Sequence, residues 1–158
     1  MEITIKYKGK LENYYEAEKY FRKKKKTYKI DKIFEILLII LGIYMIFMKN
    51  YVLGGIFIIL GIIFFTGLSE KFITKIYFTK YIKKRGFQEL IFSDEKIIYA
   101  LNDIKSEMKW DFYNGYIETP NTFLLLYHER KHYSVLPKES FSGNSLEEFR
   151  KLLKQKFN

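Results

Sequence analysis

Two long apolar runs joined by a very short polar turn constrain this sequence more than any other feature. The first run covers residues 33–48, and the second covers residues 51–69. As helices they would extend about 24 Å and about 28 Å, close to a bilayer hydrocarbon thickness of about 30 Å. The rest of a 158-residue chain is too short to cover two helices that are apolar on every side. The pattern therefore predicts a transmembrane helical hairpin.

Basic residues flank both ends of this hairpin, whereas its turn carries only Lys49. Cations gather on the cytoplasmic side of membrane helices, so we expect a multi-pass membrane protein with both termini in the cytoplasm. The chain has a formal net charge of +10, and its basic clusters abut the predicted membrane segments. They favour anionic lipid over nucleic acid as a partner, although setting the topology is a simpler role for them. The expected lipid contacts are Lys23, Lys24, Lys25, Lys26, Lys83, Lys84 and Arg85.

Outside the predicted hairpin, the spacing of apolar residues changes along the chain. Residues 2–8 alternate as a strand does, and a basic amphipathic helix follows them. From Phe87 onward, short strands alternate with turn signals until Ser145 and Glu148, which form a capping box at the start of a C-terminal amphipathic helix. We therefore expect an α+β membrane protein, with a small antiparallel β-sheet closed by a C-terminal helix. This is a pleckstrin-homology-like layout, and the N-terminal strand lies where it can pair with the sheet.

The expected organisation has four parts. They are an N-terminal strand and basic helix (1–32), a transmembrane hairpin (33–69), a helix leaving the membrane (70–86) and a pleckstrin-homology-like cytoplasmic domain (87–158).

The motif H-E-R-K-H at residues 128–132 has the spacing of zinc metalloproteases. A zinc site of that kind needs both histidines on one helical face and a third ligand. Here the flanking residues are typical of strands, so we expect a hairpin tip with exposed histidines. If both histidines continued one strand, they would lie about 13 Å apart, too far to share a zinc ion. The zinc protease remains a remote alternative.

Other catalytic signals are missing from the sequence. The chain has no cysteine, and it lacks a glycine-rich phosphate loop and a nucleophile elbow. Trp110 is the single tryptophan, and we expect it in the core rather than at a site. The sequence thus predicts a non-enzymatic protein with no catalytic residue, no cofactor and no metal ligand.

The C-terminal half contains W-D-F-Y-N-G-Y-I-E-T, then F-L-L-L-Y, S-V-L-P-K-E-S-F and L-E-E-F-R-K-L-L. Together with the two-helix hairpin, this string resembles the YcxB-like proteins of Gram-positive bacteria. The resemblance implies a cytoplasmic pleckstrin-homology-like domain tethered to the bacterial cell membrane by two helices, and it implies no reaction. The residues that match the family pattern are Trp110, Glu118, Thr119, Tyr127, Pro137, Lys138 and Phe141.

Two functions follow from this interpretation. In the first, the chain is a membrane-tethered binding or regulatory module that engages a cytoplasmic protein or anionic lipid. In the second, it is an immunity protein that blocks a membrane-active toxin through its hairpin. The sequence predicts neither the identity of a protein partner nor the oligomeric state.

Overall fold

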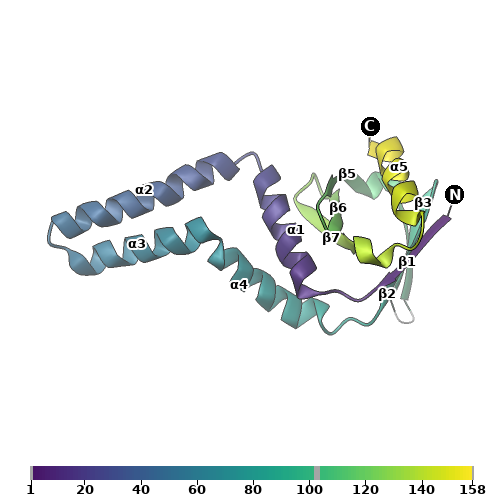
Figure 1. Cartoon of the computed structure of the whole chain (residues 1–158), viewed down its shortest axis with the longest axis horizontal. Helices are drawn as coiled ribbons and strands as arrows, with labels where there is room; N and C mark the ends of the chain where they lie inside the picture. The colour runs from purple at the N-terminus through teal and green to yellow at the C-terminus, as the bar shows by residue number, and fades with distance from the viewer. Residues whose placement is uncertain (1, 102–103, 158) are drawn as a thin grey trace. The chain divides into compact units, whose positions relative to one another are not determined.

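The computed structural model describes residues 2–101 and 104–157, and the chain divides into two compact units. One unit combines the segment up to Tyr20 with the segment from Tyr77 onward, and the other unit is Phe21–Ile76. The first contains antiparallel sheets, and the second is helical (Figure 1). The α+β class expected from the sequence is confirmed.

A four-stranded antiparallel sheet has the order β1-β2-β3-β4. In the first strand, apolar residues alternate with exposed ones, so Ile3 and Ile5 point into the core. This strand pairs with the second through Ile5 opposite Leu90, which confirms that the N-terminal strand joins the sheet. The strands are β1 (Glu2–Tyr7), β2 (Gln88–Ser93), β3 (Lys96–Leu101) and β4 (Ile104–Lys109).

A second antiparallel sheet has the order β5-β6-β7, so the single small sheet expected from the sequence is corrected to two sheets. The chain leaves the first sheet through a 3₁₀ turn, η2 (Trp110–Phe112), in which Trp110 is buried and its Nε1 donates to the Ser93 carbonyl at 2.8 Å. The predicted core role of Trp110 is confirmed. The strands are β5 (Tyr113–Glu118), β6 (Thr122–Tyr127) and β7 (His132–Pro137).

The C-terminal helix α5 (Ser145–Phe157) follows a short 3₁₀ turn, η3 (Lys138–Ser140), and packs between the sheets. The Phe149 ring lies 4.6 Å from the Phe92 ring of β2 and 5.3 Å from the Phe123 ring of β6. The predicted amphipathic helix is therefore confirmed, but the predicted capping box is wrong. The Ser145 hydroxyl donates to the Ser142 carbonyl, outside the helix.

The helical unit consists mainly of an antiparallel pair, α2 (Tyr28–Phe47) and α3 (Tyr51–Thr66). Helix α1 (Leu11–Lys24) leads into it from the first unit, and α4 (Leu68–Tyr77) leads out through a π-helical turn, η1 (Phe78–Ile82). The second predicted apolar helix ends earlier than expected. Gly67 adopts φ = 73°, the left-handed conformation that closes α3 before residue 69.

Close backbone contact joins α2 and α3. A Cβ atom on Gly42 would lie 2.8 Å from the Gly54 carbonyl oxygen, and one on Gly54 would lie 2.7 Å from the Gly42 oxygen. Only glycine allows the two helices to approach this closely.

Candidate functional site

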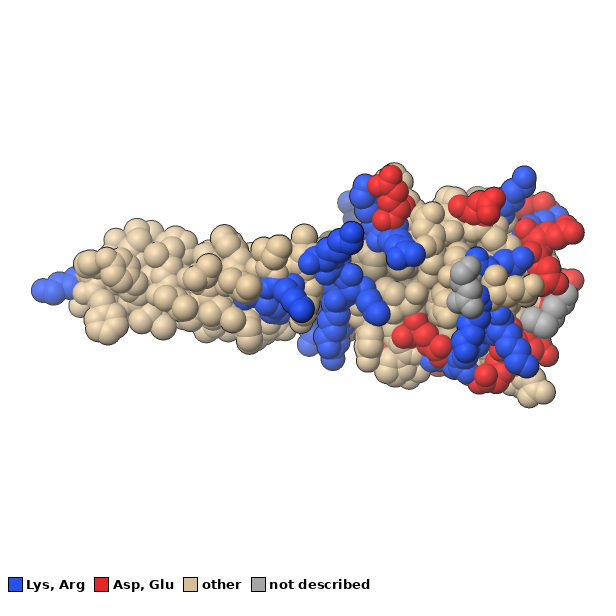
Figure 2. Space-filling model, turned by 90° about the horizontal axis from the view of Figure 1, so that it is seen from above, with Lys and Arg blue, Asp and Glu red and all other residues tan. Residues whose placement is uncertain are grey.

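The α2–α3 hairpin exposes an unusual amount of apolar surface. Phe34 is 63% exposed, Leu37 53% and Val52 75%. Figure 2 shows this part of the molecule, at the left, as a surface almost free of charged side chains except at its two ends. Soluble proteins rarely expose apolar patches larger than a few hundred Å². The hairpin therefore has the surface of an element that is covered by an apolar partner.

Whether a single helix could cross a membrane depends on its length and its apolar character. Among the described residues no single helix is both long and apolar enough to cross a bilayer, although α3 together with the helical segment Leu68–Ile82 meets both conditions as a pair bent by 65°.

A cluster of four charged residues, which we call the basal ion cluster, lies inside the helical unit. Glu35 of α2 is only 5% exposed. Its carboxylate accepts from Arg22 of α1 at 2.5 Å and from Lys32 at 2.7 Å. Arg22 also pairs with Glu70 of α4 at 2.5 Å, and Lys32 donates to the Phe65 carbonyl at the end of α3. The cluster therefore ties all four helices together, and its two cations balance its two anions.

The contacts within this cluster were not predicted from the sequence. The structure buries Glu35 and gives it two cationic partners. The sequence did contain a sign of this contact, because an acidic residue inside an apolar run requires a compensating cation.

The first predicted lipid-binding group ends α1 and begins the following turn. Lys23 and Lys24 lie in the last turn of α1, and Lys25 and Lys26 lie between α1 and α2. All four residues are exposed, and the Lys25 ammonium lies 5.3 Å from the centre of the Phe21 ring. This group belongs to the helical unit.

The second predicted group, Lys83, Lys84 and Arg85, follows η1 and belongs to the other unit. Lys83 and Lys84 are exposed in a turn. Arg85 is also exposed, and its positive charge acts on Tyr99 in the same unit. Burial raises the pKa of Tyr99, and the positive charge of Arg85 offsets part of that rise.

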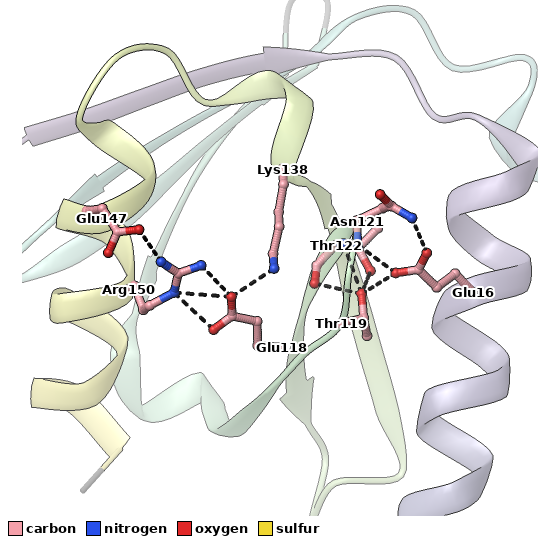
Figure 3. Close-up of polar contacts among 8 residues, drawn as sticks. All are labelled: Glu16, Glu118, Thr119, Asn121, Thr122, Lys138, Glu147 and Arg150. Carbon is pink, nitrogen blue, oxygen red and sulfur yellow. Dashed lines mark hydrogen bonds and ion pairs between the residues drawn. The ribbon is translucent and has the colours of Figure 1, made fainter.

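A polar cluster in the sheet unit surrounds Glu118 at the end of β5 (Figure 3). Its carboxylate accepts from Arg150 of α5 at 2.6 Å and from Lys138 of η3 at 2.8 Å. Arg150 also pairs with Glu147. Hydrogen bonding from Arg150 is the main cause that lowers the pKa of Glu118, and Lys138 adds to it. The cluster holds α5 and η3 against the second sheet.

Next to it, the turn between β5 and β6 binds the side chain of Glu16 from α1 (Figure 3). The carboxylate accepts from the Thr119 hydroxyl at 2.5 Å, from the Asn121 backbone N–H at 2.9 Å and from the Asn121 side chain at 2.6 Å. Burial opposes ionisation of Glu16, but these hydrogen bonds outweigh it and lower its pKa. A second contact, from the Tyr133 hydroxyl to Glu18 at 2.7 Å, attaches the same helix to β7.

The two histidines lie at the β6–β7 hairpin tip, where both are exposed as predicted. The chain reverses there through three non-glycine residues with positive φ, His128, Glu129 and Arg130. The histidine rings are consequently 5.4 Å apart, which corrects the expected separation of about 13 Å for a continuous strand. A separation calculated from strand length does not apply here, because the turn brings both rings together. Within residues 2–101 and 104–157, no group of three or more acidic, histidine or cysteine side chains is arranged to hold a metal ion.

Comparison with protein families agrees with the resemblance noted in the sequence. Residues 92–153 match the family model described as YcxB-like protein. This segment runs from the end of β2 into α5, and it includes the Glu118 cluster. The segment is therefore a YcxB-like domain. Comparisons with curated proteins and with solved structures returned no match.

Proposed function

We propose that this chain is a non-enzymatic bacterial membrane protein, in which the α2–α3 hairpin crosses the cell membrane and holds the YcxB-like domain at the cytoplasmic surface. The domain then acts as a binding module for a cytoplasmic protein or for anionic lipid. The observation that carries the proposal is the exposed apolar surface of the hairpin.

The argument for membrane insertion starts from the cost of leaving that surface in water. Phe34 and Val52 are 63% and 75% exposed, and Ile33 and Phe47 are 60% and 82% exposed. At about 25 cal/mol per Å² of apolar area, transfer of such side chains to hydrocarbon is strongly favourable. The helical backbone groups are already paired within each helix, so they add little penalty.

Helix length is compatible with a crossing. Helix α3 has 16 residues and extends about 24 Å at about 1.5 Å per residue, a few ångströms less than the hydrocarbon core. Local thinning of the bilayer accommodates such a mismatch at a modest cost. The basal ion cluster fits the same arrangement, because its charges compensate one another where the hairpin meets the other helices.

Strand pairing supports two crossings rather than one. β1 and β2 are hydrogen-bonded neighbours, although the whole helical unit separates them in sequence. Both ends of the inserted segment must therefore lie on the same side of a membrane. A hairpin satisfies this condition, and the exposed cations Lys23 to Lys26 then mark the cytoplasmic side.

The binding role rests on the layout of the sheet unit. The sheet unit contains a four-stranded sheet, a three-stranded sheet and one C-terminal helix. We interpret this layout as pleckstrin-homology-like, and a small module of that type would act by binding a partner at its surface. Exposed Lys83 and Lys84, with Arg85 beside Tyr99, offer positive charge for an anionic partner.

Membrane fractionation tests the proposal. The full chain should sediment with membranes and resist extraction by alkaline carbonate. A variant with Ile40→Lys and Ile59→Lys, which charges the exposed surface of both helices, should lose much of this resistance. The matched control Ile104→Lys charges an exposed residue in β4 and should behave like the parent. If carbonate releases the parent chain, the hairpin is not a membrane anchor.

A further inference from the structure

Helix α4 carries an exposed apolar row that the hairpin does not use. Leu68, Phe72 and Ile76 recur every four residues and are 53%, 66% and 50% exposed. Ile73 lies beside this row and is 64% exposed. Residues at this spacing share one face of a helix, so the four side chains form a continuous apolar strip.

The opposite face of α4 fixes the direction of this strip. Glu70 pairs with Arg22 at 2.5 Å, and Thr74, one turn later, is only 9% exposed. Glu70 therefore points into the helical unit, so α4 cannot turn its apolar row inward without breaking the basal ion cluster. The strip is therefore a defined outer surface of the helix.

The charged residues next to the strip are both basic. Lys71 and Lys75 are exposed and lie one turn apart beside the apolar row. The single acidic residue of α4, Glu70, is turned inward to Arg22. An apolar row with a basic border and no exposed acid is typical of helices that lie in the interface of an anionic bilayer.

The bend between α3 and α4 sets the direction of α4 relative to α3. Gly67 interrupts the helix in the left-handed conformation, and the two helical segments differ in direction by 65°. If α3 runs along the membrane normal, a helix at this angle to it runs much closer to the membrane plane. The apolar strip then continues the apolar surface of the hairpin at the level where the hairpin leaves the hydrocarbon.

We propose that α4 is an interfacial helix, with its Leu68–Phe72–Ile73–Ile76 strip in the acyl boundary of an anionic bilayer and Lys71 and Lys75 among the headgroups. This inference rests on the proposed membrane insertion of α2 and α3. It differs from the sequence interpretation, in which residues 70–86 simply leave the membrane. We favour the bilayer over a protein partner or a second copy of the chain for two reasons. The strip is continuous with the apolar surface of the hairpin, so one partner would have to cover both. The basic border also suits anionic headgroups.

Spin labelling tests the proposal directly, because the chain contains no cysteine. Single-cysteine variants at Leu68, Phe72 and Ile76 would be labelled in the full chain and reconstituted in vesicles of phosphatidylcholine and phosphatidylglycerol. Collisions with oxygen report hydrocarbon, and collisions with a water-soluble nickel complex report water. We expect oxygen to dominate at all three positions, at a similar depth of about 5–10 Å below the headgroups. A label at Lys71 should shift toward the nickel complex.

Reference labels at Ile56 and Leu60 of α3 separate this inference from the proposed function. If the references lie deep in hydrocarbon but Phe72 and Ile76 contact water, α4 is not interfacial, although the hairpin is inserted. If depth changes steadily from Leu68 to Ile76, α4 crosses the membrane and the inference is wrong. Spin–spin broadening at Phe72 would assign the strip to a second copy. References that contact water would overturn membrane insertion itself.

Discussion

Glu118 shows how single side chains hold the sheet unit together. Its carboxylate receives hydrogen bonds from Arg150 and Lys138, which come from different elements. Its side chain is 30% exposed, so solvent weakens the pairs without removing them. The resemblance to the YcxB-like family had singled out Glu118 and Lys138, but nothing in the sequence suggested that they meet each other.

This pairing predicts a pH-dependent stability. Because the folded state lowers the pKa of Glu118, mainly through Arg150, the carboxylate contributes stability above its ordinary pKa of about 4 and loses it as the pH falls through the lowered value. Glu118→Gln should lower the free energy of unfolding by about 1–2 kcal/mol at neutral pH. The difference from the parent should shrink in acid.

Urea unfolding in detergent micelles, followed by the fluorescence of Trp110, measures this effect. The control Glu107→Gln alters a carboxylate that is 61% exposed and pairs with Lys96, and it should change stability little at any pH. A Glu118→Gln difference that stays constant down to acidic pH would show that ionisation of Glu118 is not its cause.

The ion-pair partner of Glu35 is a feature that could not be predicted from the sequence. An acid in an apolar run demands a counter-charge, but its partner Arg22 lies 13 residues earlier. Several other cations stand between the two in sequence. Choosing among them requires the path of α1 relative to α2, which is a tertiary feature.

At the scale of elements, periodicity predicted the type of most segments. The alternation in β1 and the apolar stripe of α5 depend on local burial patterns, so they were visible in the sequence. Element boundaries that depend on backbone conformation were harder to predict from the sequence. Gly67 lies among several glycines, and only its left-handed backbone distinguishes it as the end of α3. The separation into two sheets likewise depends on a 3₁₀ turn at Trp110.

The contact between α2 and α3 predicts different effects for two adjacent glycines. Gly54→Ala would place a Cβ 2.7 Å from the Gly42 carbonyl oxygen and should destabilise the hairpin by about 1–3 kcal/mol. Gly55→Ala meets nothing within 4 Å and should be neutral or stabilising by up to about 1 kcal/mol, because alanine is the better helix former.

Amide hydrogen exchange in detergent micelles compares these variants, since a weaker hairpin opens more often. Exchange in α2 and α3 should accelerate in Gly54→Ala and stay near the parent rate in Gly55→Ala. Equal exchange in both variants would mean that the close approach at Gly42 and Gly54 contributes nothing to hairpin stability.

At the scale of the whole molecule, the chain inserts a helical unit between two paired strands. β1 completes the first sheet from a position far outside the segment that matches the family model. The alternating N-terminal pattern allowed the strand to be predicted, and its pairing with β2 is now defined. This connectivity makes the proposed topology testable, because β1 and the YcxB-like domain must share one side of the membrane.

Cysteine labelling in intact cells tests the central claim most directly. Asn50 lies at the α2–α3 turn, and Ser106 is exposed in β4. A membrane-impermeant maleimide added outside intact cells should modify Asn50→Cys but not Ser106→Cys, and both should react after permeabilisation. Protection of Asn50→Cys in intact cells, or labelling of Ser106→Cys from outside, would contradict a hairpin that crosses the membrane with the YcxB-like domain in the cytoplasm.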